Sequence, residues 1–230
     1  MSTHEHASPT RAWPAPTQTA EAIFTEVFRT NHWGSPESVS GPGSELRQTE
    51  AVRGALSSVL ARYPIRTVTD AGCGDVNWIR HVEGFNRLDA YVGLDVVPDL
   101  VALNRKRYGS ERMSFQRADL SRDEIPAADL VLTRDCMVHL THHEVLAFLA
   151  RIATSGSTYL LATTYTELAE NRDTTEGHWR PLNLQAAPFH LPPPIEHFDT
   201  DFTDFTDNGR HHPGNGLGLW RIEQLGTRTT

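Results

Sequence analysis

The chain has 230 residues, of which 38% are hydrophobic and 22% are charged, and this length suits one large domain rather than two. Its 21 Lys and Arg residues against 29 Asp and Glu residues give a formal net charge of −8, which disfavours a nucleic-acid partner. No apolar run approaches the roughly 20 residues that cross a bilayer, so an integral membrane protein is also disfavoured.

The N-terminus and the cysteines indicate a compartment. Residues 1–19 are rich in Pro, Thr, Ser and Ala, so we expect a flexible tail, and they lack the apolar stretch of a secretory signal. Cys73 and Cys136 are the two cysteines of the chain. We therefore expect a cytoplasmic protein in which these side chains pack close together as thiols rather than as a disulfide.

The N-terminal third predicts two helices with a loop between them. Apolar residues recur at helical spacing over Glu21–Thr30, and the following residues 31–44 are dense in Gly, Ser and Pro. A second helical pattern covers Glu45–Tyr63, and Pro64 ends it.

Short strands then alternate with helical patterns. The predicted strands are residues 67–70, 90–95, 113–116, 128–132 and 159–163. Thr141 and Glu144 fit a capping box that begins a helix. Residues 178–216 are mostly irregular or edge structure, and Leu217–Leu225 is a final strand. This order predicts a Rossmann-like, doubly wound α/β sheet of about seven strands, mostly parallel, with an antiparallel C-terminal strand.

A glycine turn at the end of the first strand indicates a cofactor site. Gly72 and Gly74 allow close approach of a ligand, and Asp95 ends the next strand, where a carboxylate accepts hydrogen bonds from ribose hydroxyls. Asn77 stands where dinucleotide enzymes have a third glycine, and a carboxylate at Asp75 would face phosphates. We therefore expect a cationic cofactor, attracted by Asp70 and Asp75, rather than NAD.

These residues resemble a class I S-adenosylmethionine-dependent methyltransferase over roughly residues 45–165. The matching pieces are Asp70-Ala-Gly72-Cys73-Gly74, Asp95, Ala118-Asp119-Leu120 and the strand Asp129-Leu130-Val131-Leu132. The resemblance implies that S-adenosylmethionine (SAM) is the cofactor. It also implies that the glycine loop contacts the methionine part, Asp95 the ribose, and Asp119 and Leu120 the adenine. With them we assign Trp78, Val96 and Arg134 to the cofactor site.

A narrower resemblance extends to the flanking segments. The stretches 33–44 (WGSPESVSGPGS), 134–140 (RDCMVHL) and 179–184 (WRPLNL) look like an uncharacterised bacterial branch of these methyltransferases. This resemblance implies a helical N-terminal cover (20–64), a cofactor-binding core (65–165) and a substrate-side segment (166–230) within one domain, 20–230.

The acceptor side follows the fourth strand. Methyl transfer is a direct displacement, so positioning matters most, and a neutral His139 is suited to take the acceptor proton. Asp135 would orient His139 or serve as the base itself, whereas a carboxylate acceptor needs no base and would be oriented by Arg134 or Arg180. The residues that we assign to the acceptor are Trp33, Tyr165, Trp179, Arg180 and Asn183.

Twelve histidines raise the question of a metal. His142 and His143 are adjacent on a predicted helix and diverge by about 100 degrees, so they do not both face one ion. The acidic, His-containing stretch 199–212 matches neither an EF-hand nor a zinc finger. We expect no metal.

The predicted function is SAM-dependent methyl transfer to an O or N atom of a small molecule, such as a specialised metabolite. A protein acceptor and a homo-oligomer are compatible with the sequence. Adenine and glutamine-amide acceptors are disfavoured, because Arg134-Asp135-Cys136-Met137 replaces an Asn-Pro-Pro-Tyr-type motif. The alternatives are cyclisation of SAM with release of methylthioadenosine, a non-catalytic cofactor-binding module and, least favoured, a nicotinamide oxidoreductase.

Overall fold

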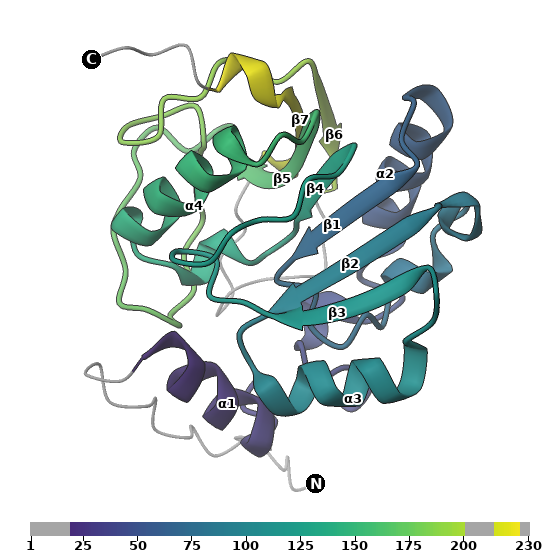
Figure 1. Cartoon of the computed structure of the whole chain (residues 1–230). Coiled ribbons are helices and arrows are strands. Elements are labelled where there is room, and N and C mark those ends of the chain that lie inside the picture. The colour runs from purple at the N-terminus through teal and green to yellow at the C-terminus, as the bar shows by residue number, and fades with distance from the viewer. Residues whose placement is uncertain (1–18, 201–213, 226–230) are drawn as a thin grey trace, which may run out of the picture.

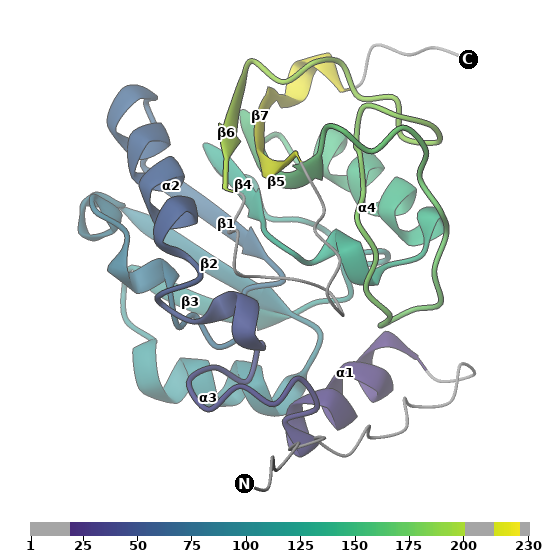
Figure 2. The same ribbon diagram turned by 180° about the vertical axis from the view of Figure 1, so that it is seen from behind.

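The computed structural model describes residues 19–200 and 214–225, which form one α/β unit around a seven-stranded sheet. The sheet order is β3-β2-β1-β4-β5-β7-β6 (Figures 1 and 2). The strands are β1 Thr67–Ala71, β2 Ala90–Asp95, β3 Met113–Arg117, β4 Leu130–Thr133, β5 Tyr159–Tyr165, β6 Glu196–Asp199 and β7 Asn215–Arg221. β1 to β5 are parallel, and β7 runs antiparallel between β5 and β6. The predicted fold is thereby confirmed.

Four α-helices occur in the described part of the chain: α1 Ala20–Thr30, α2 Glu50–Arg62, α3 Pro98–Tyr108 and α4 His142–Thr154. α2 packs its buried side chains on one face of the sheet, and α4 packs on the other, so each face has its own apolar cluster. Central strand β4 is buried along its whole length, as expected for a strand covered on both faces.

The N-terminal segment, residues 19–49, leads from α1 to α2 and lies against the sheet edge near α3 (Figure 1). Two exposed ion pairs hold α1 there: Arg29 with Asp99 of α3 at 3.2 Å and Glu21 with Arg117 of β3 at 2.9 Å. Each exposed pair contributes about 1 kcal/mol or less, so apolar contacts of α1, such as buried Ile23 and Val27, do most of the docking.

Several predicted boundaries shift. The second helix begins at Glu50 rather than Glu45, because residues 45–49 form turns after a short 3-10 helix at Pro42–Ser44. β4 begins at Leu130, since the Asp129 carboxylate accepts hydrogen bonds from the backbone N–H groups of Arg66 and Thr67 at 2.8 Å. The final strand ends at Arg221, and a 3-10 turn over Ile222–Gln224 follows it.

The helix that this alternating pattern predicts between the first two strands, directly after the glycine turn, does not form. Between β1 and β2 the described chain forms only short 3-10 turns, Ile79–His81 and Phe85–Arg87. The reason is local, because Asp75 and Asn77 use their side chains to bind the N-terminal segment, and Val76 adopts a positive φ of 50° that ends helical geometry. The expected alternation of strands with long helices therefore holds for α3 and α4, and it fails both here and between β3 and β4, where residues 118–129 form no helix.

Two predictions fall on residues outside the described ranges: the N-terminal tail up to residue 18 and the acidic, His-containing stretch from residue 201 to 212. Thr19 is described and caps α1, its hydroxyl accepting a hydrogen bond from the Ala22 N–H at 3.3 Å. Among the described residues, none of the helices has the length and apolarity needed to span a membrane.

Candidate functional site

A cavity of about 370 Å³ lies at the carboxyl ends of the central strands, under the N-terminal segment. The predicted cofactor and catalytic residues all line it: Asp70, Gly72, Cys73, Gly74, Trp78, Asp95, Val96, Asp119, Leu120, Arg134, Asp135 and His139. Of the predicted acceptor residues, Trp33, Tyr165 and Trp179 line it, and Arg180 and Asn183 do not. One cavity therefore joins residues from distant parts of the sequence.

The glycine turn, Gly72–Gly74, is hydrogen-bonded to the neighbouring strand β2. The N–H groups of Gly72 and Cys73 both donate to the Leu94 carbonyl at 2.9 Å. Gly72 has a φ of 85°, and a Cβ atom there would come within 2.6 Å of the Cys136 sulfur. A side chain at this position is thus excluded both by conformation and by the close approach of Cys136.

Asp95 closes the turn from the next strand. Its carboxylate accepts one hydrogen bond from the Gly74 N–H and one from the Val97 N–H, each at 3.0 Å. Burial raises the pKa of Asp95, and the backbone donors oppose that rise. Each oxygen retains a further lone pair, so the carboxylate is oriented and still able to accept from a ligand hydroxyl.

Asp70 is the most deeply buried carboxyl group of the site. The Tyr91 hydroxyl donates to it at 2.7 Å, and burial raises its pKa to about 7 despite that hydrogen bond. A positive ligand charge nearby would favour the ionised form. The position of Asp70 in the cavity wall therefore suits a cationic ligand.

Asp75, which we expected to attract the cofactor charge, instead holds the N-terminal segment. Its carboxylate accepts from the Ser38 hydroxyl at 2.9 Å, the Val39 N–H at 3.0 Å and the Ser40 hydroxyl at 3.3 Å. Asn77, which stands at the third position of the glycine pattern, likewise donates to the Ser44 carbonyl at 3.0 Å. The residues that depart from the pattern bind residues 38–44 over the cavity.

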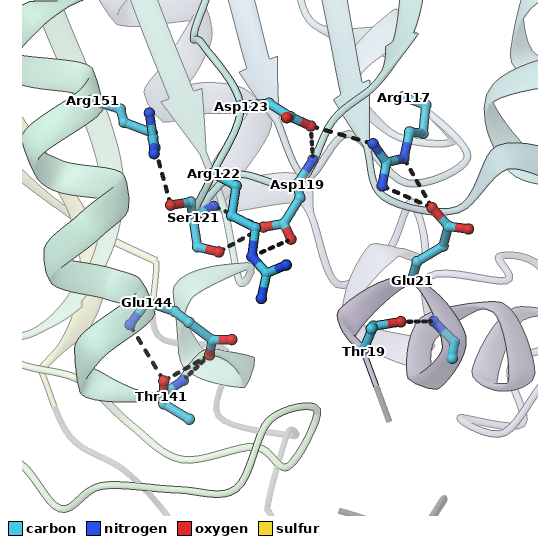
Figure 3. Close-up of polar contacts among 11 residues, drawn as sticks. Thr19, Glu21, Arg117, Asp119, Ser121, Arg122, Asp123, Thr141, Glu144 and Arg151 are labelled. Atoms are coloured by element: carbon cyan, nitrogen blue, oxygen red, sulfur yellow. Dashed lines mark hydrogen bonds and ion pairs between the residues drawn. The ribbon is translucent and has the colours of Figure 1, made fainter. Parts of the chain in front are cut away.

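The adenine end assigned from the resemblance is a polar network at the end of β3 (Figure 3). The Asp119 carboxylate accepts from the Ser121 hydroxyl at 2.7 Å and lies 3.5 Å from Arg122. Its backbone N–H donates to Asp123 at 2.8 Å, and Asp123 in turn pairs with Arg117. These contacts fix the Asp119-Leu120 stretch where the cavity meets α1.

His139 ends a 3-10 turn after β4, and its ring is oriented by a backbone group. Its Nδ1 atom lies 3.0 Å from the Gly177 carbonyl. Because a carbonyl only accepts, Nδ1 carries the hydrogen and Nε2 is the nitrogen with the lone pair. Burial lowers the pKa of His139 to about 4, so the ring is neutral at pH 7.

Arg134 and Asp135 form an ion pair in the wall of the cavity, with 2.8 Å between a guanidinium nitrogen and a carboxylate oxygen. Arg134 also donates to the Gly43 carbonyl of the N-terminal segment at 2.8 Å, and the Thr163 hydroxyl donates to Asp135 at 3.2 Å. We expected Asp135 to orient His139. The structure shows that the Gly177 carbonyl orients it instead. Asp135 adopts a φ of 49°, a conformation that is uncommon for a residue with a side chain.

Aromatic side chains form part of the cavity wall. The Trp33 ring lies 5.4 Å from the His139 ring, and Phe24 approaches the same ring edge-on at 6.3 Å. Tyr165 and Trp179 form a second edge-to-face pair at 6.1 Å. Such walls favour flat apolar ligands.

Arg180 and Asn183 serve the chain itself. The buried guanidinium of Arg180 donates to the carbonyls of Met137, at 2.7 Å, and Leu140, which are the ends of the turn that carries His139. The Asn183 amide donates to the Leu168 carbonyl at 2.9 Å. Both side chains form hydrogen bonds to backbone carbonyls and do not line the cavity. Their positions therefore do not support the predicted role as acceptor contacts.

Sequence reasoning also missed residues that line the cavity. Phe24 and Phe28 stand four residues apart on α1, and this spacing was a usable signal for one helix face. Glu144 and Glu176 share a hydrogen bond between carboxyl groups, and burial together with Glu144 raises the pKa of Glu176 to about 7. No local pattern marks Glu176, which comes from the irregular segment after β5.

Both cysteines are free thiols, and burial raises the pKa of Cys136 to about 12, so neither is set up as a nucleophile. Within residues 19–200 and 214–225, no three His, Cys, Asp or Glu side chains are grouped so that they would hold a metal ion.

Comparison with known proteins places the fold. No family model and no curated protein matches the chain. Among solved structures, magnesium protoporphyrin IX methyltransferase (ChlM) from Synechocystis PCC 6803, crystallised with bound SAM, matches with a TM-score of 0.57 and 14% identity over 89% of this chain and 97% of that one. The methyltransferase domain of bacterial CtHen1 (CN form) matches with a TM-score of 0.54 and 15% identity over 77% of this chain and 100% of that one.

A second structure of the CtHen1 methyltransferase domain (C form) matches at a TM-score of 0.45 and 18% identity over 52% of this chain and 66% of that one. At such identities, likeness is evidence of fold alone. The chain accordingly has the Rossmann-like α/β fold that the ChlM and CtHen1 (CN form) structures also have, with a cavity at the carboxyl ends of its central strands.

Proposed function

We propose that this chain transfers a methyl group from SAM to an O or N atom of a small-molecule acceptor. The observation that carries the proposal is the hydrogen bond from the Gly74 N–H to the Asp95 carboxylate. It places an oriented carboxylate beside a backbone turn without side chains in the wall of the cavity. The ChlM structure that shares this fold was crystallised with SAM. The reaction would take place in the cytoplasm, where both cysteines remain thiols.

The residues present fit this cofactor. Asp95 would hold the ribose hydroxyls, Asp119 and Leu120 the adenine, and the glycine turn with Trp78, Val96 and Arg134 the remainder. Asp70 adds a carboxyl group whose ionised form a positive sulfonium favours. The bound cofactor supplies an electrophilic methyl group on sulfur.

The chain itself contributes positioning and proton removal. Trp33, Tyr165 and Trp179 would hold the acceptor, and the N-terminal segment would exclude water from above. His139 is neutral, and its Nε2 lone pair would accept the acceptor proton. The Arg134–Asp135 pair would fix the residues 41–44 against the reacting end.

Calorimetric titration with SAM and, separately, S-adenosylhomocysteine (SAH) tests the cofactor assignment. Saturable binding of both supports the proposal, and binding of neither overturns it. Binding of NADH without SAM affinity would instead favour the oxidoreductase alternative.

Product analysis separates methyl transfer from other SAM chemistry. Incubation with SAM and a panel of acceptors should release SAH. Methylthioadenosine as the product would favour cyclisation, and binding without any product would favour a non-catalytic module.

A further inference from the structure

We infer that Gln48 is a binding residue for the acceptor, and that its side-chain oxygen takes a hydrogen bond from an uncharged N–H or O–H group at the end of the cavity formed by β5 and β7. The inference rests on the proposed function and adds a contact that the family resemblance does not assign. Three observations carry it: an unpartnered buried oxygen, its place in the sheet order, and the distribution of charge along the cavity.

The Gln48 side chain carries a polar atom that the folded chain leaves without a partner. Gln48 lies in the turn before α2 and lines the cavity. Its Oε1 atom is buried and accepts no hydrogen bond from the described residues, and none of the other described residues that line the cavity has such an atom. A buried acceptor without a donor destabilises a folded chain and is uncommon in native proteins. A ligand donor in the cavity would satisfy it.

The sheet order separates two ends of the cavity. The proposed ribose and adenine contacts follow β2 and β3, on one side of β1, whereas β4, β5 and β7 continue on the other side. Thr163 of β5 pairs with Leu217 of β7, and Tyr165 pairs with Asn215. All four residues line the cavity, and we call this part the β5–β7 end. It lies away from the cofactor contacts and is therefore the part left for the acceptor.

Gln48 belongs to the β5–β7 end. Val52, in the first turn of α2, lines the cavity and shares an apolar cluster with Leu217 of β7. The backbone between Gln48 and Val52 is compact, since the Arg53 N–H donates to the Thr49 carbonyl at 2.8 Å. The side chains of Gln48 and Val52 therefore enter the cavity at the same end.

Most acidic side chains of the cavity lie toward the cofactor strands. Asp70 lies in β1, and Asp95 ends β2. Glu144 and Glu176 share a hydrogen bond and are close enough to Asp119, which follows β3, for its charge to raise the pKa of Glu176 further. A positive group of an acceptor would be drawn to that side of the cavity.

The β5–β7 end offers uncharged groups instead. Thr200, whose N–H donates to the Asn215 carbonyl at 3.1 Å, joins Gln48, Val52 and the four strand residues there. Asp135, which the Thr163 hydroxyl contacts, is already paired with Arg134 at 2.8 Å. An ammonium group at Gln48 would find no free counter-ion among these described residues, so an uncharged donor fits the amide oxygen better.

Two pairs of planar probes that differ in one atom test this contact: 2-quinolinone with coumarin, and 2-pyridone with 2-pyranone. In each pair the lactam has an N–H where the lactone has a ring oxygen. Ligand-observed NMR on SAH-saturated protein gives each dissociation constant. Each lactam should bind at least about fivefold more tightly than its lactone, as one added neutral hydrogen bond implies.

The variant Gln48→Met replaces the amide by an apolar side chain of similar length. The lactam preference should disappear in this variant. The unliganded variant should also unfold about 2 to 4 °C above the parent in a thermal melt, because the unpartnered oxygen is gone. The matched control is Gln116→Met, at an exposed position of β3 outside the cavity, and it should leave the preference and the melting temperature nearly unchanged.

A lactam preference that survives in Gln48→Met would overturn the inference. A variant no more stable than the parent would do the same, as would a failure of all four probes to bind. Weaker SAH binding by Gln48→Met would also overturn it, because the amide would then contact the cofactor. Saturable SAH binding by the parent alongside any of these results leaves the proposed function intact, whereas a parent that binds neither SAM nor SAH marks the separate failure of the proposed function.

Discussion

The Ser40 hydroxyl occupies the space that a Cβ atom on Gly74 would need, and the Ser40 Cβ atom lies 3.0 Å from that same point. Gly74 also has a φ of 55°, a left-handed conformation that costs other residues about 1 kcal/mol or more. The N-terminal segment and the glycine turn therefore fit together only while position 74 lacks a side chain. The proposed cofactor site depends on this contact, because both residues line the cavity.

Gly74→Ala should lower the free energy of unfolding by roughly 1 to 3 kcal/mol and weaken SAH binding, since strain and the clash with Ser40 add. Ser40→Gly removes the clash and leaves the strain, so the double variant should recover part of the loss. Calorimetry measures SAH affinity and thermal unfolding measures stability for the parent, the two single variants and the double variant, which together form a double-mutant cycle. The control Gly54→Ala, in an open and exposed helical position, should stabilise the protein instead.

Asp75→Ala should release the N-terminal segment. The carboxylate accepts from the Ser38 and Ser40 hydroxyls and from the Val39 N–H, so its removal should weaken SAH binding by about 1 to 3 kcal/mol. Trypsin should also cleave after the exposed Arg47 faster, as followed by mass spectrometry.

Asp89→Ala is the matched control for that experiment. Asp89 pairs with Arg66 at the opposite end of the strands, and both side chains are more than half exposed, so cleavage and affinity should stay near those of the parent. Equal cleavage rates in Asp75→Ala and the parent would mean that Asp75 does not hold the segment.

Asp95→Ala should reduce SAM and SAH affinity alike by about 1 to 3 kcal/mol, because the ribose is the same in both ligands. The exposed Asp99→Ala, four residues along the chain, should leave both affinities nearly unchanged. Calorimetry of the two variants decides the point. Unchanged affinity in a folded Asp95→Ala protein would remove Asp95 from the ribose site.

Asp70→Asn should change how stability depends on pH. The folded pKa of about 7 lies above the ordinary value of 3.8, so the contribution of Asp70 is fully present below about pH 4 and is lost as pH rises through 7. Asparagine stays uncharged and still accepts from Tyr91. Thermal unfolding should find the variant more stable than the parent at pH 8, by roughly 2 to 4 kcal/mol, and similar to it at pH 4. If the stability of both proteins changed with pH in the same way, the titrating group would be one other than Asp70.

Arg180→Ala should act on stability. Its guanidinium holds the Met137 and Leu140 carbonyls, and leaving them unpaired should cost about 3 kcal/mol or more, seen in urea unfolding. Arg172→Ala, whose side chain is exposed, is the control. A stable Arg180→Ala protein with a selectively raised KM for its acceptor would instead return Arg180 to the substrate site.

The strands of the core were predictable because the burial of a strand is reflected in its own short run of residues. A strand buried on both faces favours a run of apolar residues, which Leu130–Leu132 and Tyr159–Ala162 show in the sequence alone. The parallel order places their carboxyl ends at one edge of the sheet, so the sequence predicts one site for the glycine turn, Asp95, Asp119 and His139, and all of them line the same cavity. The boundaries moved by a few residues where side chains such as Asp129 take over backbone hydrogen bonds.

The irregular segments were not predictable in the same way. Asp75 and Arg180 carry charges that suit a ligand as well as a backbone partner, and the choice depends on segments more than 30 residues away in sequence. Phe24 and Glu176 line the cavity because α1 and the irregular segment after β5, which are far apart in sequence, both fold against it.

The sequence by itself thus determined the sheet, the place of the site and the residue types at its base, since periodicity and strand order act over short distances. The tertiary structure alone decided which polar groups face the cavity and which bind the chain. That choice follows from long-range packing, because each buried donor or acceptor must find a partner wherever the folded chain brings one.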